Sequence, residues 1–208
     1  MRLGRLASAV SVGVWLVVVA SGLGILLSYA TTPGDIGDPP RYWPKASTIE
    51  RAEGMSTLVM FAHPRCPCTR ASLAELERIM ARSGGRLSAV VAFLSPSSEA
   101  AGWAKTDLWD RASAISGVRA VEDVDGREAR RFHVATSGHA LVYDASGAKT
   151  FSGGITSARG HEGTTAGGRA IAEGLSGSPA PDAGASVFGC SLFDAETHSA
   201  KETTVWHK

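Results

Sequence analysis

Cysteine is scarce in this chain, and net charge is nearly absent. Only three of the 208 residues are cysteines, so at most one disulfide can form within the chain, and a disulfide scaffold is excluded. The 21 basic residues almost balance the 20 acidic ones. A formal charge of +1 argues against nucleic-acid binding, which needs a basic face to neutralise phosphates. Because the three cysteines are too few to form a scaffold, any role that they have is expected to be chemical rather than structural.

Charge is missing altogether between Arg5 and Asp35, and residues 6–29 are almost continuously apolar. A run of this length is enough to cross a bilayer, and core helices rarely run this long without charge. A cleaved secretory signal peptide is the competing interpretation, because Ser28-Tyr29-Ala30 has small residues at both cleavage positions. The run is longer than the usual apolar segment of about 7 to 15 residues. We therefore favour an uncleaved, single-pass anchor over residues 1–30.

With Arg2 and Arg5 held in the cytoplasm, the rest of the chain is expected on the periplasmic, extracytoplasmic side, where disulfides persist. Without these two arginines, 19 basic residues face 20 acidic ones, so the exported part has a formal charge near −1. Residues 31–50 are rich in proline and are predicted to form a linker. The domain is expected over residues 51–176, and residues 177–208 form a Gly/Pro/Ser-rich tail with the third cysteine.

Strand and helix patterns alternate along the domain. Apolar runs at residues 57–62 and 87–94 predict buried strands, and apolar residues at helical spacing predict a helix over 69–82. After this βαβ unit comes an irregular stretch with helical segments, residues 97–116. The further predicted elements are a strand at 118–122, a helix near 126–132, a hairpin of 140–143 with 150–152, and a helix at 165–175. The pattern predicts an α/β domain.

The motif Cys66-Pro67-Cys68 directly follows the first predicted strand and opens the first helix. A thiol at a helix N-terminus faces unpaired N–H groups and the positive end of the helix dipole, which lower its pKa. Arg65 and Arg70 add positive charge nearby. A disulfide between two sulfurs so close in sequence is geometrically tight, and strain makes it more reducible. The motif therefore favours a nucleophilic or metal-binding sulfur over a structural pair.

Residues 57–70, Thr57-Leu-Val-Met-Phe-Ala-His-Pro-Arg-Cys-Pro-Cys-Thr-Arg, resemble the strand, motif and helix of the thioredoxin superfamily. They are most similar to its membrane-anchored, exported branch of TlpA-like and peroxiredoxin-like thiol proteins, and RedB-type proteins are a nearer group for comparison. The hairpin Leu141-Val142-Tyr143-Asp144-Ala-Ser-Gly147 is a second match. The resemblance covers about residues 57–175. It implies a thioredoxin-like three-layer fold with a mixed central sheet, preceded by the transmembrane helix.

The resemblance also implies an activity. The chain is expected to be a membrane-tethered thiol-disulfide oxidoreductase, in which Cys66 attacks as a thiolate, Cys68 resolves and Pro67 fixes the backbone between them. No cofactor is implied. The expected partners are exported protein thiols and disulfides, a membrane or periplasmic electron donor, and the bilayer through residues 6–29.

Two departures from the family keep other interpretations open. The motif is Cys-x-Cys rather than Cys-x-x-Cys, and Arg65 stands where the family has tryptophan. Gly138 stands at the position of the family's cis-proline. In the family, that cis-proline keeps metals away from the sulfurs. Soft sulfur ligands favour Cu(I). The alternative is a copper or other metal-binding chaperone module that uses Cys66, Cys68, His161 and Cys190. A redox-inactive scaffold that only binds a partner is a third interpretation.

A glycine-rich loop, residues 153–163, supplies candidate partners for Cys66. In a thioredoxin-like sheet the preceding strand runs back toward the cysteines, so this loop is expected near them. His161 would act as a proton acceptor or nitrogen ligand, unless it is a solvated loop histidine. His139, beside Gly138, is the second candidate.

Cys190 has three open interpretations. It resolves a mixed disulfide with Cys66 or Cys68, it completes a three-sulfur metal site, or it is a small apolar residue in a tail segment that packs on the domain. The sequence contains no phosphate-loop motif, and it gives no argument for a Ser-His-Asp arrangement or a carboxylate pair.

Overall fold

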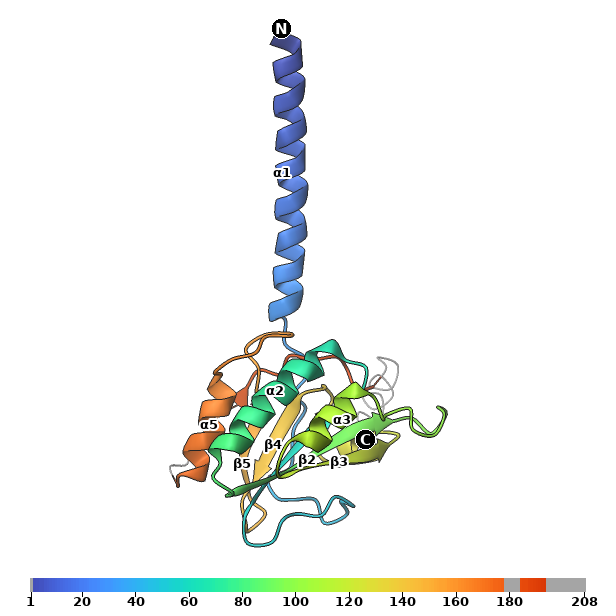
Figure 1. The fold of residues 1–208 in the computed structure, drawn as a ribbon, viewed down its shortest axis with the longest axis vertical. Helices are drawn as coiled ribbons and strands as arrows, with labels where there is room; N and C mark the ends of the chain where they lie inside the picture. Colours follow the sequence, from blue (N-terminus) through green and yellow to red (C-terminus); the bar gives the residue numbers. More distant parts are fainter. Residues whose placement is uncertain (1, 178–183, 194–208) are drawn as a thin grey trace, which may run out of the picture. The chain divides into compact units, whose positions relative to one another are not determined.

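The computed structural model describes residues 2–177 and 184–193, and it divides the chain into two units, Met1–Thr32 and Pro33–Lys208. The first unit is a single helix, α1, over Arg2–Thr31 (Figure 1). Its segment Val10–Thr31 has a mean hydropathy of 2.4, and its most apolar window is not buried within the described chain. By length and composition the predicted apolar helix can cross a membrane, although a signal sequence meets the same criteria.

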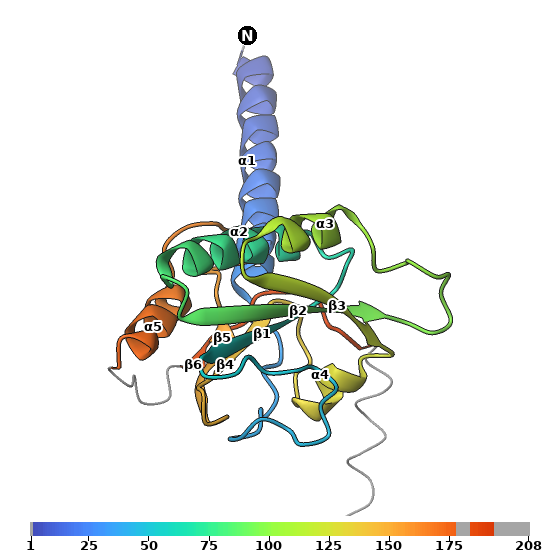
Figure 2. The ribbon, with the colours of Figure 1, turned by 60° about the horizontal axis from the view of Figure 1, so that its bottom comes forward.

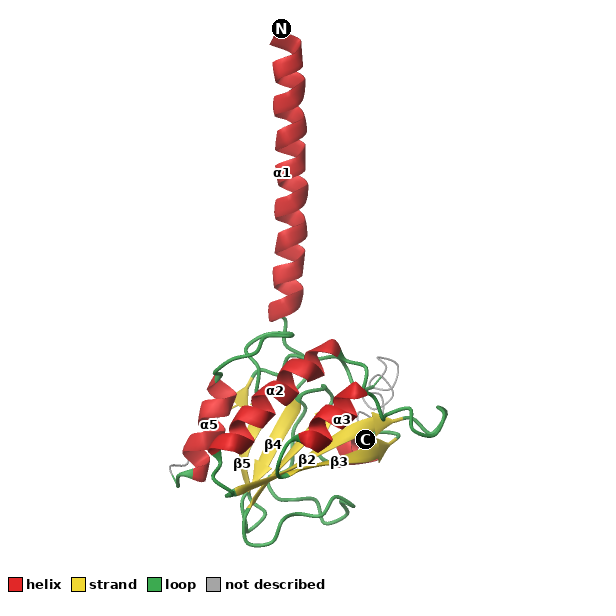
Figure 3. Ribbon diagram, in the orientation of Figure 1, coloured by secondary structure: helices red, strands yellow, loops and turns green. Residues whose placement is uncertain are grey.

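The second unit is built on a six-stranded mixed sheet with the order β3-β2-β1-β4-β5-β6. Figure 3 shows the strands in yellow and the helices in red. The central strand β1 is buried at six of its seven positions, as its apolar run predicts. Strands β1, β2 and β3 are parallel, β4 is antiparallel to β1, β5 is antiparallel to β4, and β6 is parallel to β5. The strands are β1 Ser56–Ala62, β2 Leu87–Ser95, β3 Val118–Val124, β4 His139–Tyr143, β5 Lys149–Gly154 and β6 Gly184–Ala185.

Helices cover both faces of the sheet, which makes three layers (Figure 2). One face carries α2 Pro67–Arg82, α3 Asp107–Ala114 and α5 Ala166–Leu175, and the other carries the short α4 Arg127–Arg131. The predicted thioredoxin-like three-layer architecture with a mixed sheet is confirmed. Helix α3 lies within residues 97–116, the stretch predicted to be irregular with helical segments, and it buries Leu108 and Ala112.

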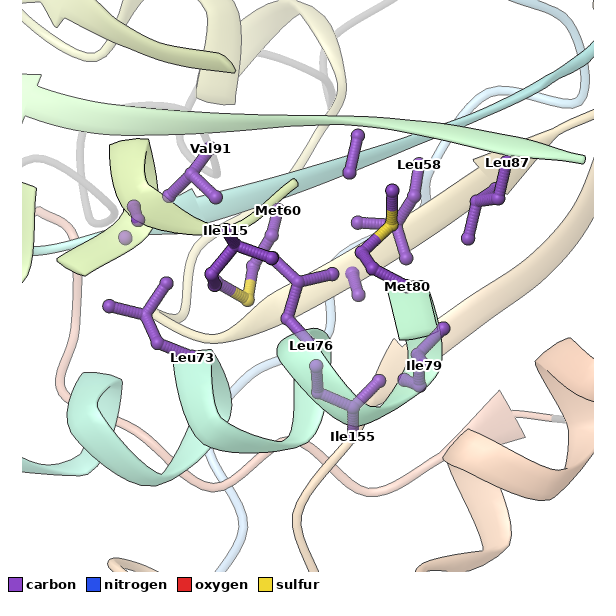
Figure 4. Packing of buried hydrophobic residues seen from close by; sticks show 14 of the residues in the cluster. Leu58, Met60, Leu73, Leu76, Ile79, Met80, Leu87, Val91, Ile115 and Ile155 are labelled. Atoms are coloured by element: carbon purple, nitrogen blue, oxygen red, sulfur yellow. The ribbon is translucent and has the colours of Figure 1, made fainter. Parts of the chain in front are cut away.

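The core follows from the alternation of side chains along β1. Leu58 and Met60 point toward α2 and pack against Leu73 and Leu76, all with 0% of their surface exposed (Figure 4). Val59, which lies between them, and Phe61, which follows, point to the opposite face of the sheet. Burying a side chain of this size contributes about 1.5 to 3 kcal/mol to stability. The two clusters fix β1 in the centre of the sheet, and the end of β1 leads into the cysteine motif.

The proline-rich residues 33–50 belong to the second unit and pack against its sheet, although they form no helix or long strand. Proline has no N–H to donate, and this segment binds mainly through its carbonyl groups. The Tyr143 hydroxyl donates a hydrogen bond of 3.0 Å to the carbonyl of Pro40. The ring of Trp43 packs edge-on against Phe132 and Tyr143, with centroids 5.1 and 5.2 Å away. This segment therefore completes the α4 face of the core.

Candidate functional site

Cys66 is the N-cap residue of α2. Its backbone is extended, with φ −85° and ψ 119°, and Pro67 takes the first helical position, where a missing N–H leaves no hydrogen bond unmade. The Cys66 N–H donates to the carbonyl of His63 at 3.1 Å, which closes a tight turn after β1. Only 1% of Cys66 is exposed. The sulfur is thus held at a helix N-terminus and shielded from solvent.

The nearest described partner of the Cys66 sulfur is Cys190, 124 residues away in sequence. The two Sγ atoms lie 2.7 Å apart as free thiols. A disulfide has an S–S length of about 2.05 Å, so a small further approach would bring these atoms to bonding distance. The structure therefore places three cysteines together, with Cys66 between Cys68 and Cys190.

Cys190 reaches the site on a segment, residues 184–193, that we call the Cys190 segment. It pairs antiparallel with the chain just before β4, through a bridge between Thr136 and Ser191. The Ser137 N–H donates to the carbonyl of Cys190 at 2.9 Å, and the Leu192 N–H donates to the carbonyl of Ala135 at 2.8 Å. These backbone hydrogen bonds hold the Cys190 segment against the domain, although only Gly184–Ala185 of it is a strand.

The net effect of these surroundings is to lower the pKa of the Cys66 thiol. Burial acts in the opposite direction and is the largest single effect, since it disfavours a charged sulfur. A hydrogen bond from the Cys190 side chain, with further hydrogen bonds from the backbone of Cys190, Cys68 and Thr69, outweighs burial. Cys66 is therefore the sulfur of the three that ionises most readily.

The two neighbouring thiols have the opposite tendency. Burial, followed by the nearby Cys66 thiolate, raises the pKa of Cys68. Burial and the hydrogen bond to Cys66 raise the pKa of Cys190 to about 12. The Arg159 guanidinium counteracts both increases, and it also hydrogen-bonds to Cys68. One ionised sulfur accompanied by two protonated ones is the arrangement expected from mutual repulsion between thiolates.

Arg159 is the cation that the glycine-rich loop brings to the sulfurs. It also donates a hydrogen bond to the carbonyl of Gly189, next to Cys190. Arg65 instead lies exposed, with its guanidinium 4.5 Å from the ring centroid of Trp103. Arg70 forms an exposed ion pair with Asp107. The loop therefore lies where the topology predicts, but its side chain that reaches the thiols is Arg159, whereas the sequence favoured His161.

The two candidate histidines are placed differently. The His161 side chain is exposed, and no hydrogen bond joins it to a sulfur among the described residues. His139 is completely buried in β4, and its Nε2 lies 3.0 Å from the hydroxyl oxygen of Ser152. Burial, followed by the charge of Lys149, lowers the pKa of His139 to about 4, so its ring is neutral near pH 7. Neither histidine contacts the thiols through a hydrogen bond in the described chain.

Gly138 has a conformation that proline cannot adopt. Its φ is +87°, its N–H donates to the carbonyl of Phe61 at 2.7 Å, and a Cβ would lie 2.9 Å from the Ser72 hydroxyl oxygen. No cis peptide bond occurs in residues 2–177 and 184–193. The position of the family's cis-proline is therefore occupied by a glycine whose N–H ties this loop to the end of β1.

The metal-binding alternative uses Cys66, Cys68, His161 and Cys190 as candidate ligands. Residues 2–177 and 184–193 contain no group of three or more His, Cys, Asp or Glu side chains that could hold a metal ion. The alternative ligand set therefore does not form such a group among the described residues, and the His161 side chain is exposed. Residues 178–183 and 194–208 of the predicted tail lie outside the described residues.

The fold and the position of the cysteines define a thioredoxin-like domain. No protein-family model matches the chain, and no curated protein matches its sequence. An uncharacterized conserved protein from Geobacillus kaustophilus is similar in structure, with a TM-score of 0.57 and 17% identity over 78% of this chain and 92% of that one. The hypothetical protein SMc02350 from Sinorhizobium meliloti 1021 has a TM-score of 0.55 and 18% identity, over 77% and 93%.

Matches with lower scores include proteins of known chemistry. A secreted Mycobacterium tuberculosis disulfide oxidoreductase homologous to E. coli DsbE has a TM-score of 0.42 and 16% identity, over 60% of this chain and 83% of that one. The copper-bound structure of ScoI from Bradyrhizobium japonicum also matches, with a TM-score of 0.41 and 12% identity over 60% of this chain and 85% of that one. At these identities the similarity shows the fold alone, and the membership of a TlpA-like or RedB-type subfamily stays a prediction.

Proposed function

We propose that this chain is a membrane-tethered thiol-disulfide oxidoreductase that acts outside the cytoplasm. The proposal rests on one observation, the contact between the Cys66 sulfur at the N-terminus of α2 and the Cys190 sulfur. Cys66 combines a lowered pKa with a second thiol, Cys190, whose Sγ lies 2.7 Å away. Disulfide exchange needs a thiolate that attacks the substrate and a second thiol that completes the reaction.

In the proposed reaction, the Cys66 thiolate attacks one sulfur of a substrate disulfide and forms a mixed disulfide with it. The other substrate sulfur leaves as a thiolate and takes up a proton. A second thiol of the chain then loses its proton, attacks the Cys66 sulfur and expels the first substrate sulfur. The substrate disulfide gains two electrons, and the two cysteines of the chain become a disulfide. A thiol donor returns the two electrons for the next cycle.

Direct mixing of the reduced protein with a disulfide tests this proposal. The full chain in detergent, reduced and freed of reductant, is mixed with a chromogenic aromatic disulfide, and release of the aromatic thiolate is followed over time. We expect Cys66→Ser to slow the release at least about tenfold, because it removes the most ionised sulfur. The proposal fails if Cys66→Ser reacts as fast as the wild type.

The absorbance of the thiolate gives a second readout that does not depend on access to the sulfur. A pH titration of the reduced chain is expected to show one thiolate that Cys66→Ser removes, and its pKa should lie below about 8.5, the value of free cysteine. A Cys66 titration at or above that value would leave the site without its proposed nucleophile.

The proposed location rests on α1 and on the basic residues before its apolar run. Labelling of intact cells with a membrane-impermeant thiol reagent tests it, with a cytoplasmic thiol protein as the control. The three cysteines are buried or partly buried, so the reagent needs better access to a thiol. Cells are therefore first treated with a denaturant that leaves the membrane closed. Alternatively, a cysteine is added at an exposed site such as Ala101. Labelling only after lysis would place the domain in the cytoplasm and refute this part of the proposal.

A further inference from the structure

We propose that Cys190, rather than Cys68, is the resolving cysteine of this site, so that the disulfide formed during the cycle joins Cys66 to Cys190. This inference deepens the proposed function and rests on it. It assigns a catalytic task to a residue 124 positions away from the cysteine motif.

The first argument is geometric. The Cys66 and Cys190 sulfurs already lie 2.7 Å apart, and they come from separate chain segments that approach from different directions. Cys68 is the second residue of α2, and a bond to Cys66 would have to close a small ring that includes Pro67. Disulfides require a specific separation and orientation of the two Cβ atoms, and a small ring restricts both. A long-range pair meets these requirements without distorting the helix start.

The second argument is that the domain is shaped to hold the Cys190 segment. Val187 and Leu192 are buried on either side of Cys190, with 1% and 5% of their surfaces exposed. Glycines occur where the backbones meet most closely. A Cβ at Gly189 would lie 1.8 Å from the carbonyl oxygen of Ser137, and one at Gly154 would lie 2.3 Å from the carbonyl oxygen of Ser186. Such approaches are possible only for glycine, so the segment is an integral part of the site.

The third argument concerns access. Cys66 is only 1% exposed, whereas Cys190, whose sulfur contacts that of Cys66, is partly exposed. An external thiol therefore meets the Cys190 sulfur first when the two cysteines are joined. Its attack there expels Cys66, and the sulfur with the lowest pKa is the best leaving group.

The reducing step is balanced as follows. The donor thiolate forms a bond to the Cys190 sulfur, and the Cys66–Cys190 bond breaks with its electron pair on Cys66. A second donor thiolate then attacks the donor sulfur of this mixed disulfide, which releases Cys190 as a thiolate that takes up a proton. Two donor thiols become one donor disulfide, and the chain recovers both thiols. The reduced Cys66 then attacks the next substrate once the Cys190 sulfur has moved aside.

Mapping of the disulfide in the full-length protein tests the assignment. The detergent-solubilised chain is oxidised with a small disulfide, its free thiols are alkylated, and peptides are identified by mass before and after reduction. We expect one cross-linked pair that contains Cys66 and Cys190, with Cys68 alkylated. A Cys66–Cys68 link as the main product, or no intramolecular disulfide at all, overturns the inference.

Matched variants separate this inference from the proposed function. We expect Cys68→Ser to keep the intramolecular disulfide, whereas Cys190→Ser loses the Cys66–Cys190 disulfide and slows turnover at least about tenfold, because an intramolecular step becomes bimolecular. Cys190→Ala and thermal unfolding show whether any loss is a folding defect.

If Cys190→Ser turns over like the wild type, the inference fails and the proposed function stands. If the wild type does not reduce disulfides, the proposed function fails, and the mapping still decides which sulfurs pair.

Discussion

Arg159 donates a hydrogen bond from its guanidinium to the carbonyl oxygen of Gly189, the residue before Cys190. The same guanidinium hydrogen-bonds to the Cys68 sulfur and counteracts the increase in the pKa of both Cys68 and Cys190. One side chain therefore positions the Cys190 segment and also eases ionisation of the thiols that burial keeps protonated. This dual contact makes Arg159 a positioning residue of the proposed site.

Arg159→Gln is expected to slow formation of the intramolecular disulfide several-fold. Without the guanidinium, the pKa of Cys190 rises further, so a smaller fraction of this thiol can attack at a given pH. The measurement is the rate of disulfide formation between pH 7 and 10, and the pH dependence should shift to higher pH. Arg70→Gln is the control, since Arg70 forms an exposed ion pair of small energetic value. Equal rates and pH profiles for wild type and Arg159→Gln would contradict this account.

Gly189→Ala tests how closely the Cys190 segment must approach the domain. The added Cβ would lie 1.8 Å from the Ser137 carbonyl oxygen, so the segment must move away and take Cys190 with it. We expect the Cys66–Cys190 disulfide to form at least about tenfold more slowly, because the two thiols lose their enforced proximity. Alkylation of Cys66 in the reduced chain should become faster.

The control for this variant is Gly174→Ala. Gly174 lies in α5 and a Cβ there meets nothing within 4 Å, so the change is expected to leave the site unaltered and to stabilise the helix by up to about 1 kcal/mol. If Gly189→Ala and Gly174→Ala form the disulfide at the same rate, close approach of the Cys190 segment does not control it.

The fold was predictable where a local pattern is strong. The apolar runs of β1 and β2 and the helical spacing of α2 lie in the sequence where the structure has those elements. Strand β6 has only two residues, Gly184–Ala185, so it is too short to show a periodic pattern. It pairs with β5, which lies far earlier in the sequence. Its existence depends on tertiary contacts.

The site was predictable in part for the same reason. The position of Cys66 at a helix N-terminus follows from the strand and helix patterns on either side of it. Its nearest sulfur, on Cys190, comes from a contact across 124 residues, which no local pattern specifies. The available signal was Gly189 beside Cys190 between two buried apolar residues, Val187 and Leu192, which together indicate a segment that packs tightly.

Gly138→Pro is expected to destabilise the domain even though proline is the residue that the thioredoxin family carries at this position. The substitution removes the N–H that donates to the Phe61 carbonyl, and proline cannot adopt the φ of +87°. The lost hydrogen bond and the backbone strain together cost roughly 2 to 4 kcal/mol. Urea unfolding of the detergent-solubilised chain measures the loss. Unchanged stability would mean that the loop rearranges easily to a cis bond.

His139 is expected to make the domain less stable in mild acid. Its pKa is about 4 in the folded chain, because burial and the charge of Lys149 disfavour the protonated ring, whereas an unfolded histidine has a pKa near 6.5. Between these values the unfolded state binds more protons, so the contribution of His139 to stability is fully present above pH 6.5 and is lost as the pH falls toward 4. The loss amounts to about 3 kcal/mol. Urea unfolding at several pH values should show a flatter profile for His139→Gln than for the wild type. A His139→Gln profile as steep as that of the wild type would assign the acid sensitivity to other groups.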